Sequence, residues 1–261
     1  MKQVKKFCVS PVEQELSFRV WCQKNDIKAV LFDGDDTLWR TVPIFRMQMG
    51  KSYDRLVEIG HFDRETWKSK VEEINNRLFE TCGVNPIRWD LVVEELGQFG
   101  LDDQAKSQLK QVLAEIYQIP PKFVEETESG LAFLKSTGIQ MGIVTHANVE
   151  WTRRKFGWLG LERFLGWDDV FVVDENGQKT KQSWMEAMNY FKVRPENCVV
   201  VGDSPRSDIN PVCELGVRHC FLVKNKYDIW SIHQQPVDEL KTQEVRSVND
   251  LRWLGREVVY K

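Results

Sequence analysis

The chain has 261 residues, of which 42% are hydrophobic, and its formal net charge is −3. This composition is ordinary for a folded globular protein and lacks the basic excess that nucleic-acid binding requires. No apolar run approaches the length of a membrane-spanning helix, and the six cysteines are scattered without a CxxC pair. We therefore expect a cytoplasmic protein with no nucleic-acid or membrane partner, whose oligomeric state the sequence does not reveal.

The first part of the chain predicts a short extension, a strand and a helical block. Residues 1–27 form the extension, in which 11–25 could be an amphipathic helix through Val12, Leu16 and Val20. The apolar run at 28–33 predicts a buried strand. From about residue 43 to 122 the apolar residues recur at helical spacing, which predicts an all-helical segment.

Strands and helices alternate after residue 125. Each predicted strand contains a short apolar run, and each is separated from the next by a helical pattern. The predicted strands lie at 140–148, 168–173, 197–204 and 219–223. This alternation predicts an α/β fold, with a parallel sheet covered by helices on both faces. We expect a core domain formed by residues 1–42 and 123–261, interrupted by a helical cap domain at 43–122.

Polar residues follow three of the predicted strands at the edge where ligands bind in open α/β sheets. Asp33 and Asp35 follow the first, Thr145 ends the next, and Asp203 and Asp208 follow the last of the three. Asp33–Asp36 alone could merely cap a turn or a helix start. The second acidic strand end favours a metal site instead, because crowded carboxylates stay ionised together only around a cation, and hard oxygen ligands select Mg²⁺.

These residues resemble the motifs of the haloacid dehalogenase superfamily. The stretch "FDGDDTLW" matches its DxDx(T/V) motif at Asp33, Asp35 and Thr37, Thr145 matches the second motif, and "GDSPRSD" matches the fourth at Asp203 and Asp208. The helical segment is similar to the family's C1 cap, and the branch is that of the small phosphatases. The resemblance implies a Rossmann-like core and Mg²⁺-dependent phosphoryl transfer.

The resemblance also implies a role for each residue. Asp33 would be the nucleophile and Asp35 the general acid and base, and Mg²⁺ would be held by Asp33, the backbone carbonyl of Asp35 and Asp203. Asp208 would support the metal indirectly. The groups implied to bind the substrate phosphate are Thr145 and a lysine, with Lys179 favoured over Lys181 by its position. His146 could touch the substrate or have no role.

We therefore expect a Mg²⁺-dependent phosphatase that hydrolyses a small phosphorylated metabolite through an aspartyl-phosphate intermediate. Asp35 favours phosphate esters over dehalogenation, because a departing halide needs no proton. Two alternatives stay open at this point, namely a phosphotransferase of the sugar phosphomutase type and a non-catalytic phosphate-binding or regulatory protein. The sequence leaves the substrate open, because it does not show which cap residues face the site.

Overall fold

The computed structural model describes residues 10–224, 235–236, 238 and 241–256. Its main element is a six-stranded sheet in the order β5-β4-β1-β6-β7-β8, and every neighbouring pair is parallel. The strands are β1 (Ala29–Phe32), β4 (Gln140–Thr145), β5 (Val170–Val172), β6 (Cys198–Gly202), β7 (His219–Val223) and β8 (Thr242–Val245). The predicted α/β class is confirmed. The edge strand β8 was not predicted, because "TQEV" contains no apolar run.

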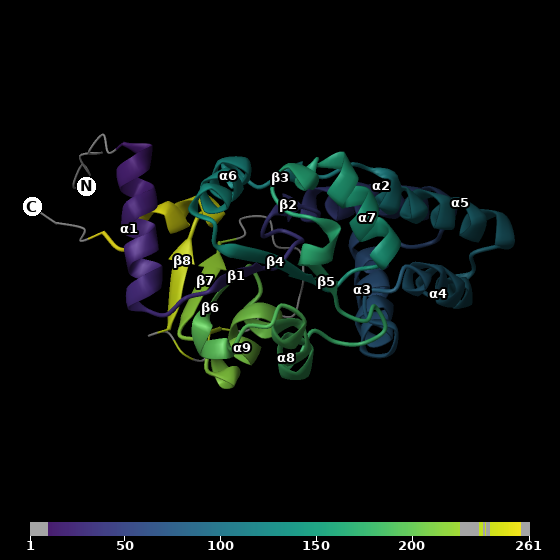
Figure 1. The fold of residues 1–261 in the computed structure, drawn as a ribbon. Coiled ribbons are helices and arrows are strands. Elements are labelled where there is room, and N and C mark those ends of the chain that lie inside the picture. Colours follow the sequence, from purple (N-terminus) through teal and green to yellow (C-terminus); the bar gives the residue numbers. More distant parts are fainter. Residues whose placement is uncertain (1–9, 225–234, 237, 239–240, 257–261) are drawn as a thin grey trace, which may run out of the picture.

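Helices cover both faces of this sheet (Figure 1). Val30 and Phe32 point to one face, where they pack with α1 (Pro11–Lys24), α6 (Thr127–Thr137), the end of α7 (Val149–Trp158) and the 3₁₀ helix η7 (Val248–Trp253). Ala29 and Leu31 point to the other, against α8 (Lys181–Tyr190) and α9 (Asn210–Leu215). Because successive strand residues face opposite ways, an uninterrupted apolar run fits a strand that is buried on both sides.

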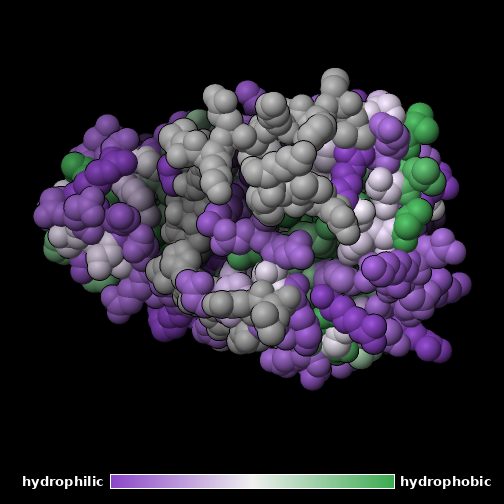
Figure 2. All heavy atoms as spheres, turned by 90° about the vertical axis from the view of Figure 1, so that its left-hand side faces the viewer, coloured by the Kyte–Doolittle hydropathy of each residue, from purple (hydrophilic) through white to green (hydrophobic). Residues whose placement is uncertain are grey.

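Helix α1 forms as predicted, but its apolar stripe faces outward. Ser10 and Glu13 form a capping box at its start, and Phe18 and Cys22 are its buried residues. Val12, Leu16 and Val20 are exposed. Figure 2 shows hydrophobic side chains gathered on this end of the molecule. Three apolar residues at helical spacing therefore marked the helix without marking its buried face.

A helical insert interrupts the chain after β1. It contains α2 (Val42–Ile59), α3 (Arg64–Cys82), α4 (Ile87–Leu96), α5 (Asp103–Ala114) and the 3₁₀ helices η1 (Gly97–Phe99) and η2 (Glu115–Gln118). These helices pack around a hydrophobic cluster of their own, centred on residues such as Trp67, Val93 and Leu109. The division into core and cap domains stays a prediction.

The two ends of the helical insert are joined to each other. The short strand β2 (Trp39–Arg40) enters the insert, and β3 (Lys122–Phe123) leaves it, and the two pair as an antiparallel ladder. Short helices make the remaining turns: η3 (Leu161–Arg163), η4 (Trp167–Asp169), η5 (Pro195–Asn197) and the π-helical η6 (Pro205–Ile209). Among the described residues, none of the helices combines the length and the apolar character needed to cross a membrane.

Candidate active site

The carboxyl ends of β1, β4 and β6 converge on one cavity of about 270 Å³. Phe32 at the end of β1 pairs with Ile143 of β4 and Val201 of β6, so the polar residues that follow lie side by side. The backbone N–H of Asp33 extends the ladder by donating to the Val201 carbonyl over 2.8 Å. Asp33, Asp35, Asp203 and Asp208 all line the cavity. Parallel strand order thus brings together residues that are up to 175 positions apart in the chain (208 minus 33).

Three carboxylates form a compact cluster on the floor of the cavity. One oxygen from each of Asp33, Asp203 and Asp208 lies within 4.8 Å of the others. The Nζ of Lys179, itself buried, donates to Asp33 over 2.7 Å and to Asp208 over 2.6 Å. Lys181 instead begins α8, is exposed, and pairs with Glu214. The structure therefore brings Lys179, and not Lys181, to the carboxylates.

Burial and like charge set the ionisation of this cluster. Burial raises the pKa of Asp33 above its usual value, the ammonium of Lys179 offsets part of that effect, and Asp208 adds to it. Burial alone would lower the pKa of Lys179, but Asp208 and Asp33 outweigh it and raise that pKa, so the lysine stays charged. The cluster suits a cation, because its donors are hard carboxylate oxygens whose repulsion a divalent ion would relieve.

Two glycines allow this crowding. A Cβ on Gly202 would lie 2.5 Å from the carboxylate of Asp208, and one on Gly34 would lie 2.5 Å from the Trp39 ring and 3.1 Å from the hydroxyl oxygen of Thr145. That hydroxyl is buried and has no hydrogen-bond partner among the described residues. An unpaired buried hydroxyl beside the carboxylate cluster is suited to binding an oxygen of a ligand.

Asp35 has partners that the sequence did not suggest. Its carboxylate receives hydrogen bonds from Lys155 Nζ over 2.6 and 2.8 Å and from the Trp39 indole over 2.6 Å. Lys155 lies on α7, is fully buried, and its ammonium sits 3.8 Å from the centre of the Trp151 ring. Its only signal in the sequence is its position four residues after Trp151, which places the two side chains on the same side of a predicted helix.

Asp36 anchors the start of the helical insert. It adopts a left-handed backbone with φ of +60° and accepts hydrogen bonds from the Thr41 backbone and hydroxyl and from the Val42 backbone. Burial raises the pKa of Asp36 to about 6. These contacts agree with the ability of aspartate to bond nearby backbone in a turn.

His146 follows Thr145 and also lines the cavity. Burial, followed by the nearby charge of Lys179, lowers the pKa of His146 to about 4, so the ring is neutral at pH 7. Its Nε2 has no hydrogen-bond partner among the described residues. His146 therefore offers a neutral ring, rather than a cation, to anything bound in the cavity.

The helical insert supplies the other wall of the cavity through Phe45, Asn75, Phe79, Arg88 and Tyr117. It is held against the core at the α3–α4 turn: the Val84 N–H donates to the Glu175 carbonyl over 2.8 Å, and the Gln178 side chain donates to the Phe79 carbonyl over 3.2 Å. No sequence pattern identified these wall residues, since apolar periodicity cannot tell a packing aromatic from one that lines a cavity.

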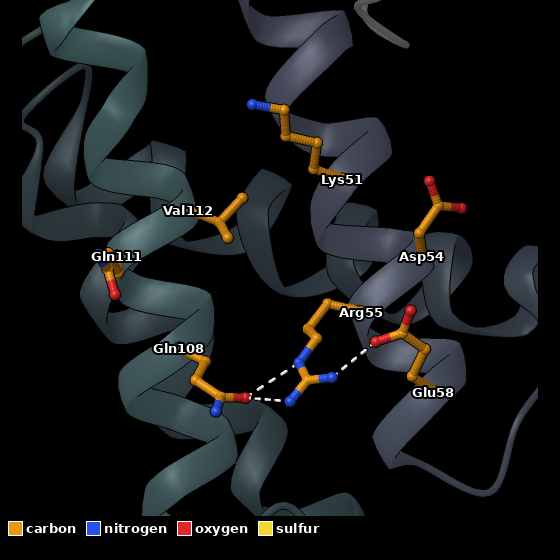
Figure 3. A pocket seen from close by; sticks show the side chains of 7 residues that line it. All are labelled: Lys51, Asp54, Arg55, Glu58, Gln108, Gln111 and Val112. Carbon is orange, nitrogen blue, oxygen red and sulfur yellow. Dashed lines mark hydrogen bonds and ion pairs between the residues drawn. The ribbon is translucent and has the colours of Figure 1, made fainter.

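A second hollow lies between α2 and α5 on the helical insert, and Figure 3 shows the residues that line it. Each of its charged groups already has a partner of opposite charge: Lys51 pairs with Glu115, Asp54 with Arg64, and Arg55 with Glu58. It therefore lacks the concentrated charge of the first cavity, which is the candidate active site.

Comparison with known proteins agrees with this geometry. Residues 27–210 match the family model of the haloacid dehalogenase-like hydrolases. The chain belongs to this family. A glyceraldehyde 3-phosphate phosphatase from Methanocaldococcus jannaschii is 25% identical to it, and the match covers 77% of this chain and 87% of the relative. A second one, from Methanopyrus kandleri, is also 25% identical, and the match covers 86% of this chain and 97% of that relative.

Solved structures agree on the fold of this haloacid dehalogenase-like hydrolase. A haloacid dehalogenase-like family hydrolase from Xanthomonas campestris superposes with a TM-score of 0.71 at 19% identity, covering 87% of this chain and 89% of that one. The predictions of the superfamily and of its Rossmann-like fold are confirmed. The predicted enzyme class is also confirmed, because the two relatives above and a third from Pyrococcus furiosus are all named glyceraldehyde 3-phosphate phosphatases.

Proposed function

We propose that this protein is a Mg²⁺-dependent phosphatase that hydrolyses a small phosphomonoester through an aspartyl-phosphate on Asp33. One observation carries the proposal. Lys179, the unpaired Thr145 hydroxyl and the cluster of Asp33, Asp203 and Asp208 lie together in a cavity of about 270 Å³. A cavity of this size suits a substrate of few atoms.

In the first step, a carboxylate oxygen of Asp33 attacks the phosphorus atom of the ester. The bond from phosphorus to the leaving oxygen breaks, and protonated Asp35 gives its proton to that oxygen, so the alcohol departs neutral. The product on the enzyme is an acyl phosphate. Lys179 and the Thr145 hydroxyl bind the phosphoryl oxygens and stabilise the charge that they carry in the transition state.

In the second step, Asp35 removes a proton from a water molecule whose oxygen attacks the phosphorus. The bond between phosphorus and Asp33 breaks, which releases inorganic phosphate and restores both carboxyl groups. Lys155 and Trp39 would hold the Asp35 carboxyl group in position, since both donate hydrogen bonds to its Oδ1.

The carboxylates that would hold Mg²⁺ are Asp33 and Asp203, together with the backbone carbonyl of Asp35. When bound, the ion would neutralise the negative charge of the phosphoryl group and of its nucleophile. Asp208 bonds Lys179 and the Ser204 backbone N–H, over 2.6 and 3.0 Å. That engagement supports an indirect role for Asp208.

His146 completes the phosphate site as a neutral neighbour. Its Nε2 and the Thr145 hydroxyl both lack partners among the described residues, and His146 lines the same cavity. Because the ring is neutral, His146 adds no positive charge that would compete with Lys179 for the carboxylates.

The test is phosphate release from p-nitrophenyl phosphate, glyceraldehyde 3-phosphate and a panel of other small phosphomonoesters, in Mg²⁺ and in EDTA. We expect release in Mg²⁺ and a loss of at least about 100-fold in EDTA, restored by excess Mg²⁺. Equal rates in both conditions would contradict the metal requirement. Phosphate transfer to a second sugar phosphate without release would indicate a phosphotransferase, and silence in a folded protein would favour a binding role.

A further inference from the structure

The helical insert contains one buried arginine whose charge no acid balances. Arg88, in the first turn of α4, is 5% exposed and lines the candidate active site. Among the described residues, no carboxylate forms an ion pair with its guanidinium, and its Nε has no hydrogen-bond partner. A buried cation without a counter-charge is costly, so such groups are usually paired with an anion.

The other partners of Arg88 fix its position without neutralising it. One terminal nitrogen donates to the carbonyl of Gly83, and the guanidinium carbon lies 5.0 Å from the centre of the Phe79 ring and 5.2 Å from that of Trp89. A carbonyl and two aromatic faces can orient a guanidinium, and they leave its full positive charge available.

Neighbouring arginines of the insert show what pairing looks like in this chain. Arg55 bonds both Glu58 and Gln108, as the dashed lines in Figure 3 mark, and Arg64 and Arg77 pair with Asp54 and Glu95. These three are on the surface, where pairing is least needed. Arg88 is deeper than any of them, yet it faces the cavity without an acid.

We propose that Arg88 binds a carboxylate on the substrate, so that the preferred substrates are small phosphomonoesters whose alcohol part carries a carboxylate group. The inference rests on the proposed phosphatase function and adds to it the substrate class. Arg88 and Lys179 line one cavity, and Lys179 belongs to the phosphoryl site. A planar guanidinium matches a carboxylate through two parallel hydrogen bonds. Asn75 lines the same cavity, and its unpartnered amide oxygen can accept a hydrogen bond from a hydroxyl group of the substrate.

The experiment compares two substrates that differ in one group. 3-Phosphoglycerate has a carboxylate where glyceraldehyde 3-phosphate has an aldehyde, and the phosphoester is the same in both. We expect wild-type kcat/KM to be at least about tenfold higher for the carboxylate, because a site built for an anion leaves Arg88 unpaired with the aldehyde. In Arg88→Met the ratio of the two kcat/KM values should fall by at least about tenfold, to about one or below.

Because both substrates are measured with the same variant, their ratio does not depend on how much of the protein is folded. Arg88→Lys should recover part of the wild-type ratio. Arg55→Met is the matched control, since it removes a paired arginine of the same insert, and it should leave the ratio within about twofold of wild type. A wild-type preference for the aldehyde, or an unchanged ratio in Arg88→Met, would overturn the inference while leaving the phosphatase intact. Failure of both substrates and of p-nitrophenyl phosphate would instead overturn the proposed function.

Discussion

The two walls of the cavity differ in whether their buried cations are paired with acids. The core wall is formed by the cavity residues that follow β1, β4 and β6. Among the described residues, the two buried lysines that contact its acids are both paired: Lys179 bonds Asp33 and Asp208, and Lys155 bonds Asp35. On the insert wall, Arg88 has a carbonyl and aromatic rings but no acid among the described residues. The buried cations of the core wall are therefore paired within the protein, whereas the partner proposed for Arg88 on the insert wall is an anion of the substrate.

From this difference we expect the core wall to perform the reaction and the insert wall to select the substrate. The core wall is built on strand ends, which hold carboxylates in fixed positions for bond breaking. The insert wall is built on helices, and in the proposed reaction its side chains face the part of the substrate that does not react. Changes in the core wall should thus lower turnover of every substrate, and changes in the insert wall should alter the ranking of substrates.

The largest effect is expected for Asp33→Asn, which removes the proposed nucleophile from the core wall. Phosphate release from every substrate should fall by at least about 1,000-fold, because an amide cannot form the acyl phosphate. Asp168→Asn, an exposed aspartate outside the cavity, is the control and should retain full activity. Similar rates for wild type and Asp33→Asn, measured with Mg²⁺ present, would rule out this nucleophile.

A smaller, substrate-dependent effect is expected for Lys155→Met, which removes the cation that holds Asp35. We expect kcat for an alkyl phosphate to fall by about 100-fold, and kcat for p-nitrophenyl phosphate to fall by about tenfold. The two differ because p-nitrophenolate leaves with little help from an acid, so misplacing Asp35 matters less.

The control for Lys155→Met is Lys181→Met, since Lys181 is exposed and pairs only with Glu214 among the described residues. Its kcat should stay within about twofold of wild type. An equal loss for both substrates in Lys155→Met, accompanied by a large drop in melting temperature, would show that Lys155 acts on stability alone.

The smallest effect concerns stability and pH, through His146 between the two walls. The pKa of His146 is about 4 in the folded protein, against an ordinary value of 6.5, so the unfolded chain binds the extra proton first as the pH falls. Stability is therefore full above pH 6.5 and declines towards pH 4. Through this histidine, the free energy of unfolding should be about 2 kcal/mol lower at pH 5 than at pH 7.

His146→Asn removes this titration, and its melting temperature should fall less than that of wild type between pH 7 and pH 5. The difference should be about 4–8 °C for a chain of this size. Differential scanning fluorimetry at the two pH values measures it. An equal fall in melting temperature for the two proteins would mean that the pKa of His146 is the same in the folded and unfolded states.

Much of the core wall could be predicted from the sequence, because its residues sit directly after strands. The apolar run "AVLF" is followed directly by Asp33. The parallel arrangement of the strands brings Thr145 and Asp203 to the same edge of the sheet. Lys155 escaped prediction, since a lysine on a helix usually lies in solvent and only packing shows that this one is buried against Asp35.

The sequence by itself determined the α/β fold, the helical insert and the family, because hydrophobic periodicity and a few closely spaced acids are local features of the chain. Only the tertiary structure brought Lys179, rather than Lys181, to the carboxylates, turned the Val12, Leu16 and Val20 stripe outward, and placed Arg88 at the cavity. Those outcomes depend on which faces of separate elements meet. That is a property of packing between distant segments, and no local pattern of residues encodes it.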